Sequence, residues 1–384
     1  MKKDVAIVGI GWEGFQPTTP HYSYKEMIYQ AAQRAYFDAK VDPRKDIQSF
    51  VTVAEDFTEG TSIFDEYTPD QLGAALKPMH TIPGDGLHGV ITAYLMIRSG
   101  ICQVVAVEAH SKASNVKTLP QITHYALDPI VNRPFEFYPE FIAGLEMQRF
   151  LFENNLTIEE CSLVVQKNRR NALNNASAPY SCDLSLTEIN NSEPLSYPLL
   201  HSHVAQNADG AIVIVLANHE IANSLRKDPI WIIGVGWCND SNSLEYREWG
   251  NLPYLSEAAR MAYQQADIQN PSTTIDFAEI DDLYAYRELM SLSALKLVPN
   301  AYLAEAITNG ALTPEGNLPI NISGGCLGIG NLLEANGCAK LIEGVLQLRG
   351  EAGKRQLPQP HIGIVQSWRG IPTTSAAVVI LANS

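Results

Sequence analysis

Two glycine-rich turns have the spacing of a phosphate-binding loop. Residues 9–14 read GIGWEG and residues 84–89 read GDGLHG, so each matches the G-x-G-x-x-G pattern of dinucleotide-binding enzymes. In that pattern a strand leads into the glycines and a helix opens at them, so that the helix N-terminus meets the pyrophosphate. Nucleotide binding is therefore the first hypothesis that the sequence raises.

Neither turn has the complete strand, turn and helix context. After the first turn, residues 15–24 read FQPTTPHYSY, and the prolines at positions 17 and 20 exclude a helix start there. The second turn leads into a helical stretch, but we expect the preceding segment PMHTIP not to be a strand. We therefore favour a structural interpretation, in which the glycines permit a tight turn and close helix packing, over a nicotinamide site.

Several titratable side chains near these turns could carry acid–base chemistry. His88 lies at the start of a helix, where the positive end of the helix dipole would lower its pKa and favour a neutral imidazole that accepts a proton. If residues 275–284 form a strand, alternation sends Asp282 and Tyr284 to one face and Asp281 to the other. Tyr284 or Asp281 is then a candidate acid–base group. The alternatives are structural: a hydrogen-bonded His88, an Asp282 that caps a neighbouring helix and a Tyr284 that fills volume.

The thiols and the paired histidines give weaker signals. The six cysteines are scattered without a C-x-x-C pair, which favours free thiols in a reducing compartment. Cys326 follows a double glycine, and a buried structural thiol is the simpler interpretation. His201 and His203 are spaced like metal ligands, but no third ligand accompanies them, so we predict no metal and a lining or structural role for His203.

An internal repeat indicates how these residues are positioned. Residues 5–12 read VAIVGIGW and residues 230–237 read IWIIGVGW. Each copy is followed, in the same order, by a helical stretch, a short strand, a turn with a helix, and a further strand, at 24–39, 49–55, 84–100 and 103–110 in the first copy and at 255–266, 275–284, 323–350 and 361–368 in the second.

The same pattern predicts the fold class and the domain organisation. Near-continuous apolar strands at 211–217 and 376–382 are typical of buried sheets in an α/β fold. We predict two duplicated halves, residues 1–225 and 226–384. The segment at about 112–205 breaks the repeat, and we interpret it as an insertion with some helix that covers one face.

The order of these segments resembles that of the thiolase superfamily. The resemblance rests on VAIVGIG, on DGLHG followed by VVAVEA, on EIDDLYAYREL and on NISGGCLGIGNLLEANG, and it is strongest for sterol-carrier-protein-type thiolases. It implies a five-layered αβαβα fold built from two halves, with the insertion over the mouth of the active site. It also implies an acyl-CoA substrate, a homodimer and a small partner protein with an OB-fold and a zinc ribbon.

The resemblance also indicates that the usual catalytic residues are missing. Gly86 matches the nucleophilic cysteine of the family, and Asn331 matches the histidine that activates it. In the E-x-H-D-C-F box of the family, Asp281 matches the histidine and Leu283 the cysteine. A covalent acyl-enzyme mechanism is therefore not expected.

The glycines of both turns are retained, and the resemblance implies that they form two oxyanion holes. We take as candidate catalytic residues His88, Asp281, Tyr284 and Asn331. The residues expected to line the substrate or oxyanion site are Gly86, Gly89, Asp282, Gly324, Gly325, Cys326 and His203.

Composition excludes some classes of partner. The formal net charge of −15 at pH 7 argues against binding to nucleic acid or to an anionic membrane surface, both of which select basic patches. No apolar run reaches the roughly 18 residues of a spanning helix, and the N-terminus does not read as a signal peptide, so we expect a cytoplasmic protein.

Three functions fit these residues. The first is an enzyme that makes or breaks a carbon–carbon bond of an acyl-CoA without a covalent intermediate, as the cysteine-less thiolase-like aldolases do. The second is a non-catalytic binding or scaffold subunit of an acyltransferase complex. The third is an acetyl-CoA acyltransferase with rearranged catalytic residues that uses Cys326. We predict the first, with a CoA thioester as substrate and no covalently bound cofactor.

Overall fold

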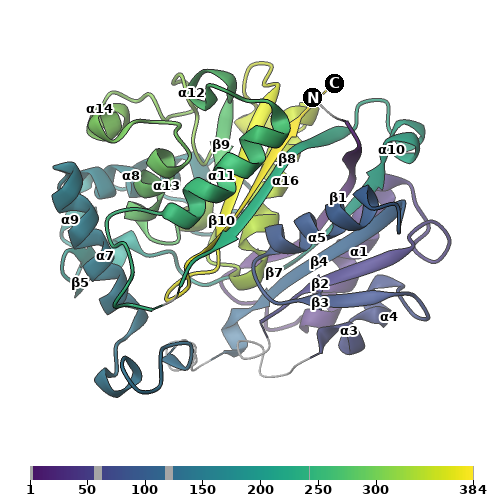
Figure 1. Cartoon of the computed structure of the whole chain (residues 1–384), viewed down its shortest axis with the longest axis horizontal. Coiled ribbons are helices and arrows are strands. Elements are labelled where there is room, and N and C mark those ends of the chain that lie inside the picture. The colour runs from purple at the N-terminus through teal and green to yellow at the C-terminus, as the bar shows by residue number, and fades with distance from the viewer. Residues whose placement is uncertain (1–2, 56–62, 117–123, 242, 384) are drawn as a thin grey trace.

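The computed structural model describes residues 3–55, 63–116, 124–241 and 243–383. Nine strands of this part of the chain form one mixed sheet, in the order β3-β2-β4-β7-β1-β8-β11-β10-β9 (Figure 1). Their bounds are β1 Val5–Gln16, β2 Ser49–Val53, β3 Met79–Ile82, β4 Val104–Lys112, β7 Asp209–Asn218, β8 Ile230–Asn239, β9 Phe277–Glu279, β10 Ile362–Trp368 and β11 Ser375–Ala382.

The sheet is arranged about the antiparallel pair β1–β8 at its centre, where Ala6 lies opposite Trp231. On one side of this pair follow β7, β4 and β2, and on the other β11, β10 and β9. On each side, counting outward from the central pair, the first two strand pairs are antiparallel and the third is parallel. The two copies of the internal repeat, which form β1 and β8, therefore begin equivalent sets of strands.

Two alanine-rich helices cover the outer faces of the sheet, and glycines in the strands let them approach closely. α1 (Tyr24–Ala39) packs on β1, and α11 (Pro253–Ala266) packs on β8. A Cβ added at Gly11 would lie 2.2 Å from the carbonyl oxygen of Ala31, and one at Gly236 would lie 1.9 Å from that of Ala258. The glycines of the first turn thus serve helix packing, as the structural interpretation predicted.

Two further helices lie between the halves of the sheet. α5 (Gly86–Arg98) and α16 (Asn336–Arg349) contact each other, and both share an apolar core with Ile7 of β1 and Ile232 of β8. The intervening strand residues, such as Ala6 and Ile233, belong to the core under α1 and α11. The order is therefore helix, sheet, helix, sheet, helix, which confirms the α/β fold with five layers.

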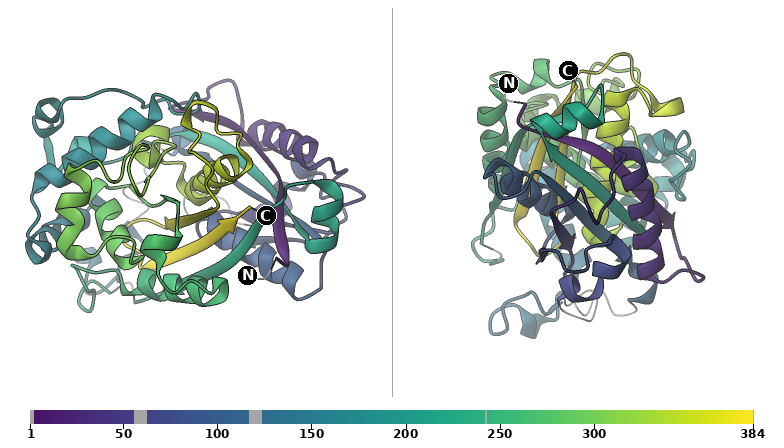
Figure 2. Two further views of the ribbon diagram at one scale, coloured as in Figure 1. Left: turned by 90° about the horizontal axis from the view of Figure 1, so that it is seen from above. Right: turned by 90° about the vertical axis from the view of Figure 1, so that its right-hand side faces the viewer.

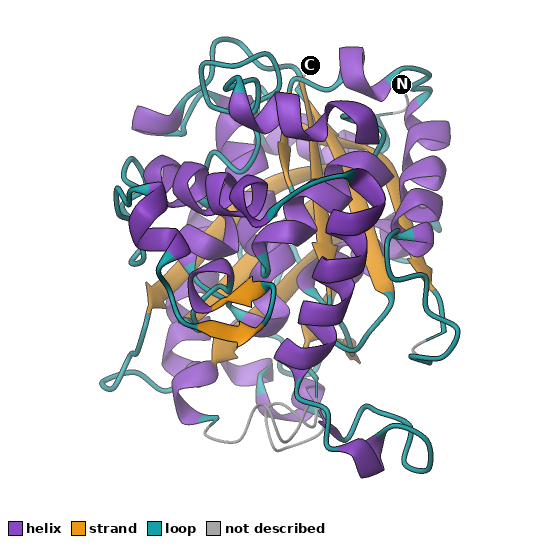
Figure 3. Ribbon diagram, turned by 90° about the vertical axis from the view of Figure 1, so that its left-hand side faces the viewer, coloured by secondary structure: helices purple, strands orange, loops and turns teal. Residues whose placement is uncertain are grey.

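The insertion is mainly helical and packs against the C-terminal half. It contains α7 (Pro139–Asn154), α8 (Ile158–Ala172), α9 (Leu186–Asn190) and the hairpin β5 (Pro194–Ser196) and β6 (Leu199–Leu200). α8 contacts α13 (Ala285–Ala294), α14 (Leu303–Thr308) and α15 (Gly325–Ile329). Figure 3 shows these helices in front of the large sheet, with the small hairpin beside them. Residues 117–123 of the predicted insertion lie outside the described residues.

The remaining helices are short and peripheral. They are α3 Phe64–Tyr67, α4 Pro69–Leu72, α10 His219–Leu225 and α12 Pro271–Thr274. The N- and C-terminal ends lie at the same side of the molecule (Figure 2). Among the described residues, no helix has the length and apolar character needed to cross a membrane.

Two expectations about strands were wrong. The segment PMHTIP contains a strand, β3, which runs parallel to β2 at the edge of the sheet. Its side chains are mostly half-buried, so the continuous apolar pattern of an interior strand is missing. Strand β9 covers only Phe277–Glu279, because residues 280–284 form a loop before α13 begins at Ala285.

Candidate functional site

A cavity of about 530 Å³ lies where the two halves and the insertion meet. The turns before α5 and α16 supply residues 84–85, 331, 333, 334 and 336, and other walls come from residues 55, 283–284 and 368–373. The insertion and the residues after it supply 126, 139–140, 195, 201 and 204–207. Of the candidate catalytic residues, Tyr284 and Asn331 line this cavity, whereas His88 and Asp281 do not.

Gly86 has no room for the side chain that the resemblance places there. A Cβ added to Gly86 would lie 2.4 Å from Cys338 Sγ and 3.1 Å from the backbone nitrogen of Cys338. Neither residue lines the cavity, and a Cβ at Gly89 would lie 2.3 Å from Val53 of β2. These contacts correct the expectation that Gly86 and Gly89 line the substrate site, because both are packed against neighbouring elements.

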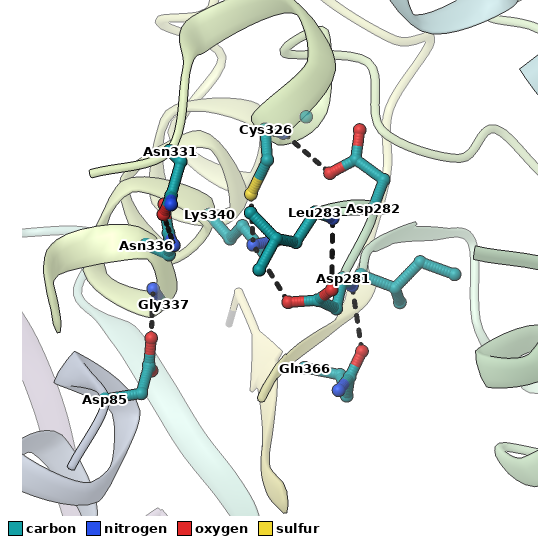
Figure 4. Close-up of polar contacts among 12 residues, drawn as sticks. Asp85, Asp281, Asp282, Leu283, Cys326, Asn331, Asn336, Gly337, Lys340 and Gln366 are labelled. Atoms are coloured by element: carbon teal, nitrogen blue, oxygen red, sulfur yellow. Dashed lines mark hydrogen bonds and ion pairs between the residues drawn. The ribbon is translucent and has the colours of Figure 1, made fainter. Parts of the chain in front are cut away.

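The side chain of Asp85 accepts a hydrogen bond from the backbone N–H at the start of α5. It is the N-cap residue, and its Oδ1 accepts a hydrogen bond of 2.9 Å from Leu87 N–H. Its Oδ2 accepts another, also 2.9 Å, from Gly337 N–H at the start of α16 (Figure 4). The residue is only 2% exposed, and burial raises the pKa of its carboxyl to about 6. One buried carboxylate therefore joins the N-termini of the two central helices.

Asp282 has the same arrangement at the second turn. Its carboxylate accepts hydrogen bonds from Cys326 N–H at 2.6 Å, from Leu327 N–H at 3.2 Å and from Asn168 Nδ2 at 2.8 Å. Burial raises the pKa of this carboxyl to about 6 as well. Asp282 thus caps α15 and does not line the cavity, which corrects the expectation that it lines the substrate site.

The double glycine before α15 is shaped by the same packing. A Cβ at Gly325 would lie 2.1 Å from the carboxylate of Asp282, and one at Gly324 would lie 2.5 Å from the Cβ of Ala172. Both glycines have positive φ values, 100° at Gly324 and 58° at Gly325. The expected second oxyanion hole is therefore filled by a side chain of the protein itself, and these glycines do not line the cavity.

Behind the cavity wall lies a buried cluster of Cys326, Lys340 and Asp281 (Figure 4). Lys340 Nζ donates a hydrogen bond of 3.1 Å to Cys326 Sγ and lies 4.0 Å from Asp281 Oδ2. Burial raises the pKa of the Cys326 thiol well above its usual range, so the thiol is neutral. Because Leu283 forms the wall in front of this cluster, Asp281 and Cys326 lie one layer behind the cavity. This corrects the expectation that Cys326 lines the site.

Tyr284 presents its ring to the cavity beside an aromatic wall. Because residues 280–284 are a loop, side-chain alternation does not apply, and Tyr284 turns toward the cavity while Asp282 turns toward α15. The ring centroid of Tyr284 lies 6.3 Å from that of Trp368, which also lines the cavity. Burial raises the pKa of the Tyr284 phenol, so the hydroxyl remains a proton donor at neutral pH. The guanidinium of Arg287 stacks on the far face of this wall, 3.6 Å from the centroid of Trp368.

Asn331 holds the turn before α16 in place. Its Oδ1 accepts hydrogen bonds from Leu333 N–H at 3.0 Å and from Asn336 Nδ2 at 2.7 Å, and its Nδ2 donates to Asn207 Oδ1 at 3.1 Å. The amide lines the cavity, where it supplies hydrogen-bonding atoms and no titratable group.

Of the three histidines singled out in the sequence, His201 lines the cavity, whereas His88 and His203 do not. His88 has a pKa lowered to about 4, by burial and by the charge of Arg369, so its imidazole is neutral as expected, although burial is the main cause. Neither ring nitrogen has a hydrogen-bond partner among the described residues. His203 is fully buried, with Nε2 3.0 Å from Ser162 Oγ and Nδ1 accepting from Leu200 N–H. This structural environment corrects the expectation that His203 lines the substrate site.

Five charged residues of the cavity were not identified from the sequence: Glu55, Asp85, Glu140, Glu334 and Arg369. Glu55 and Arg369 form an ion pair, and the Glu55 N–H donates to Glu334 Oε1 at 3.3 Å. These three residues come from distant segments of the chain, so no sequence spacing connects them, and Glu140 lies in the first turn of α7. Asp85 had a usable signal, because an aspartate directly before a helical stretch is a typical N-cap. Within the described residues, no group of three His, Cys, Asp or Glu side chains could hold a metal ion.

Comparisons with known proteins agree with this architecture. Residues 238–383 match the family described as "Thiolase C-terminal domain-like". The chain is 26% identical to an "Acetyl-CoA acetyltransferase" of Methanothermobacter thermautotrophicus, with 97% of this chain and 98% of that protein covered. It is 25% identical to "Sterol carrier protein 2" of Bos taurus, with 95% of this chain and 70% of that protein covered. The solved structure "Ltp2-ChsH2(DUF35) aldolase" superposes with a TM-score of 0.85 at 24% identity, with 99% of this chain and 98% of that chain covered.

The duplicated sheet, the paired central helices, the matched C-terminal domain and the full-length relatives point to one family. Residues 238–383 form a thiolase C-terminal-like domain, and over nearly its whole length the chain is similar to proteins of the thiolase superfamily.

Proposed function

We propose that this protein makes or breaks a carbon–carbon bond of an acyl-CoA by aldol or retro-aldol chemistry, without a covalent acyl-enzyme. The observation that carries this proposal is the closed position at Gly86, where Cys338 leaves no space for a nucleophilic side chain. The solved structure of similar fold that is named an aldolase supports the same reaction class.

The cavity offers groups suited to that chemistry. Tyr284 supplies a neutral phenol that can donate a hydrogen bond to a carbonyl or alkoxide oxygen, and Asn331 supplies amide hydrogen-bonding atoms. Apolar side chains, among them Trp368 and Leu283, line the same space beside these polar groups. Such a site stabilises the oxygen of a thioester enolate, which is the intermediate shared by the aldol and retro-aldol directions.

A reaction through Cys326 has little support. The thiol is 3% exposed, does not line the cavity, and has a pKa that burial raises well above the ordinary value. A thiol in this state is a weak nucleophile. Intact-mass spectrometry after incubation with acetyl-CoA tests this directly, since an acyl adduct on Cys326 would favour the acyltransferase alternative.

One observation favours the second candidate, a non-catalytic scaffold subunit. The N–H groups of both glycine turns are already bonded to buried carboxylates, Asp85 at one and Asp282 at the other. A scaffold would bind a CoA thioester or a partner without turning substrate over.

The proposed function also includes a homodimer and a partner protein with an OB-fold and a zinc ribbon. We expect this partner to present the acyl-CoA to the cavity.

Binding and turnover separate the two candidates. Calorimetric titration with CoA and acetyl-CoA comes first, and saturable binding is expected under both. The second step incubates the protein with a β-hydroxyacyl-CoA and follows the appearance of the shorter thioester by mass spectrometry. Tyr284→Phe keeps the ring and removes the hydroxyl, so we expect unchanged binding and a turnover lower by about 10². Absence of cleavage by the wild-type protein, with binding intact, would favour the scaffold.

A further inference from the structure

We propose that Asp85 is the proton carrier of this site: its carboxylate takes up and returns the proton that moves during carbon–carbon bond formation and cleavage. This inference rests on the proposed aldol-type function. It concerns a residue that lies directly before Gly86, at the start of α5.

The position of Asp85 carries the first step of the argument. Asp85 lines the cavity together with Tyr284 and Asn331, although the residue is only 2% exposed. Gly86, one residue further on, is closed by Cys338 and can present nothing to a substrate. The reactive group at this turn can therefore only come from a neighbouring position, and Asp85 is the neighbour whose side chain reaches the cavity.

The hydrogen bonds of Asp85 leave room for a proton. Each carboxylate oxygen accepts one N–H bond, Oδ1 from Leu87 and Oδ2 from Gly337. The hydroxyl of Ser367 also hydrogen-bonds this carboxylate, and the Lys340 ammonium of α16 acts on its charge. The two carboxylate oxygens have four lone pairs in total, so one remains for a proton or a substrate hydroxyl. Because the two donors belong to different halves of the molecule, they hold the carboxylate in one orientation at the junction of α5 and α16.

Other acidic groups near the site are less suited to the task. Asp282 is turned away from the cavity toward α15, and Asp281 lies behind Leu283. Glu55 lines the cavity, but its carboxylate is held in an ion pair with the guanidinium of Arg369. Burial, by contrast, raises the pKa of Asp85 to about 6, which leaves it ionised at neutral pH yet basic enough to accept a proton.

The step balances without any further reactant. In cleavage, the Asp85 carboxylate removes the proton of the β-hydroxyl, the C–C bond breaks to give a carbonyl and a thioester enolate, and the protonated Asp85 returns the proton to the α-carbon. In the reverse direction, Asp85 takes an α-proton from the acyl-CoA, the enolate carbon attacks the carbonyl, and the alkoxide regains the proton. No electrons are exchanged with an oxidant or reductant.

The reverse direction gives a probe that needs no second substrate. The wild-type protein should exchange the α-protons of propionyl-CoA for deuterium in D₂O, which proton NMR follows directly. The rate should rise with pH through an apparent pKa of about 6, because only the ionised carboxylate acts as a base.

The matched variants are Asp85→Ser and Asp282→Ser. Both aspartates are buried helix caps with a pKa raised to about 6, but only Asp85 lines the cavity. At position 85 serine is a good N-cap that keeps an acceptor for the Leu87 N–H, and at both positions it removes the carboxylate together with one of its two backbone bonds. We expect Asp85→Ser to bind propionyl-CoA as the wild type does, to exchange its α-protons about 100-fold or more slowly, and to regain exchange when sodium formate is added. Asp282→Ser should keep the pH profile of the wild type.

Each outcome of these exchange measurements supports or overturns the role proposed for Asp85. Wild-type exchange that Asp85→Ser retains, with the same pH profile, would overturn the role of Asp85 while leaving the proposed function in place. An equal loss in both variants that formate does not restore would also overturn it, because a cap alone would then explain the effect. If the wild-type protein binds propionyl-CoA but neither exchanges its α-protons nor cleaves a β-hydroxyacyl-CoA, both the proposed function and this inference fail.

Discussion

The closed position at Gly86 makes a quantitative prediction about stability. In Gly86→Ala, the new Cβ would lie 2.4 Å from Cys338 Sγ and 3.1 Å from the Cys338 nitrogen, distances that force α5 or α16 to shift. Overpacking of a core costs about 1–3 kcal/mol, and the contact with backbone places this case at the upper end, about 3 kcal/mol. The double variant Gly86→Ala with Cys338→Ala removes the sulfur and with it the worst contact.

A double-mutant cycle measures that compensation. Cys338→Ala alone removes one buried heavy atom and should cost about 1 kcal/mol. Independent effects would therefore sum to about 4 kcal/mol, whereas we expect the double variant to lose about 2 kcal/mol, a coupling of about 2 kcal/mol. The free energy of unfolding from urea titrations gives each value, with circular dichroism as the signal.

A control pair on the same helix isolates the contact. A Cβ at Gly344 of α16 would meet Leu381 and Val365, and Cys338 is not among its neighbours. The pair Gly344→Ala with Cys338→Ala should be additive within about 0.5 kcal/mol. A Gly86→Ala variant as stable as the wild type, or a Gly86 cycle as additive as the control, would refute the steric argument.

Three further predictions follow from buried groups and close contacts. Burial, reinforced by Glu343, raises the pKa of Glu279 to about 8, above its unfolded value of about 4.3, so its contribution to stability is present in acid and is lost as the pH rises through about 8. The free energy of unfolding of Glu279→Gln, measured by urea titration relative to that of the wild type, should therefore be higher at pH 9 than at pH 5. The same difference at both pH values would contradict the raised pKa. The pKa of His88, lowered to about 4, predicts that its imidazole NMR resonances stay constant between pH 5.5 and 8, and a midpoint near 6.5 would show the ring to be solvated. Gly236→Ala places a Cβ 1.9 Å from the carbonyl oxygen of Ala258, so we expect loss of the folded protein on expression. Gly350→Ala is the comparison: a Cβ there meets nothing within 4 Å, and only the left-handed backbone, with φ of 74°, disfavours alanine, so this variant should fold with a smaller loss of stability.

Much of the fold follows from local patterns that the chain carries twice. Apolar strands and alanine-rich helices recur in the same order, and α1 spans Tyr24–Ala39, the range that its helical spacing predicts. In the structure a capping box of Ser23 and Glu26 fixes its start. The edge strand β3 was missed because its half-exposed side chains lack the apolar run of an interior strand. Pairing with β2, which fixes it as a strand, is a tertiary contact.

The site was predicted less completely, because its residues are joined by contacts rather than by spacing. Tyr284 and Asn331 were identified through their boxes and do line the cavity, but Asp282 and His203 turned out to be packed elsewhere. The ion pair of Glu55 and Arg369 joins loops 314 positions apart, a separation that no local pattern can encode.

The repeat, the α/β class and the thiolase-like order of segments can all be read from the sequence, because periodicity and propensity act over a few neighbouring residues. The glycine in place of the expected nucleophile is visible there as well. The reason why that glycine must stay a glycine, and the contacts that hold its turn, appear only in the folded protein. The sulfur of Cys338 fills the space beside Gly86, and the carboxylate of Asp85, the N-cap of α5, bonds the N–H of Gly337 in the first turn of α16, 252 positions away in the chain. Both facts depend on the packing of α5 against α16, and close packing is a property of the assembled core rather than of either segment.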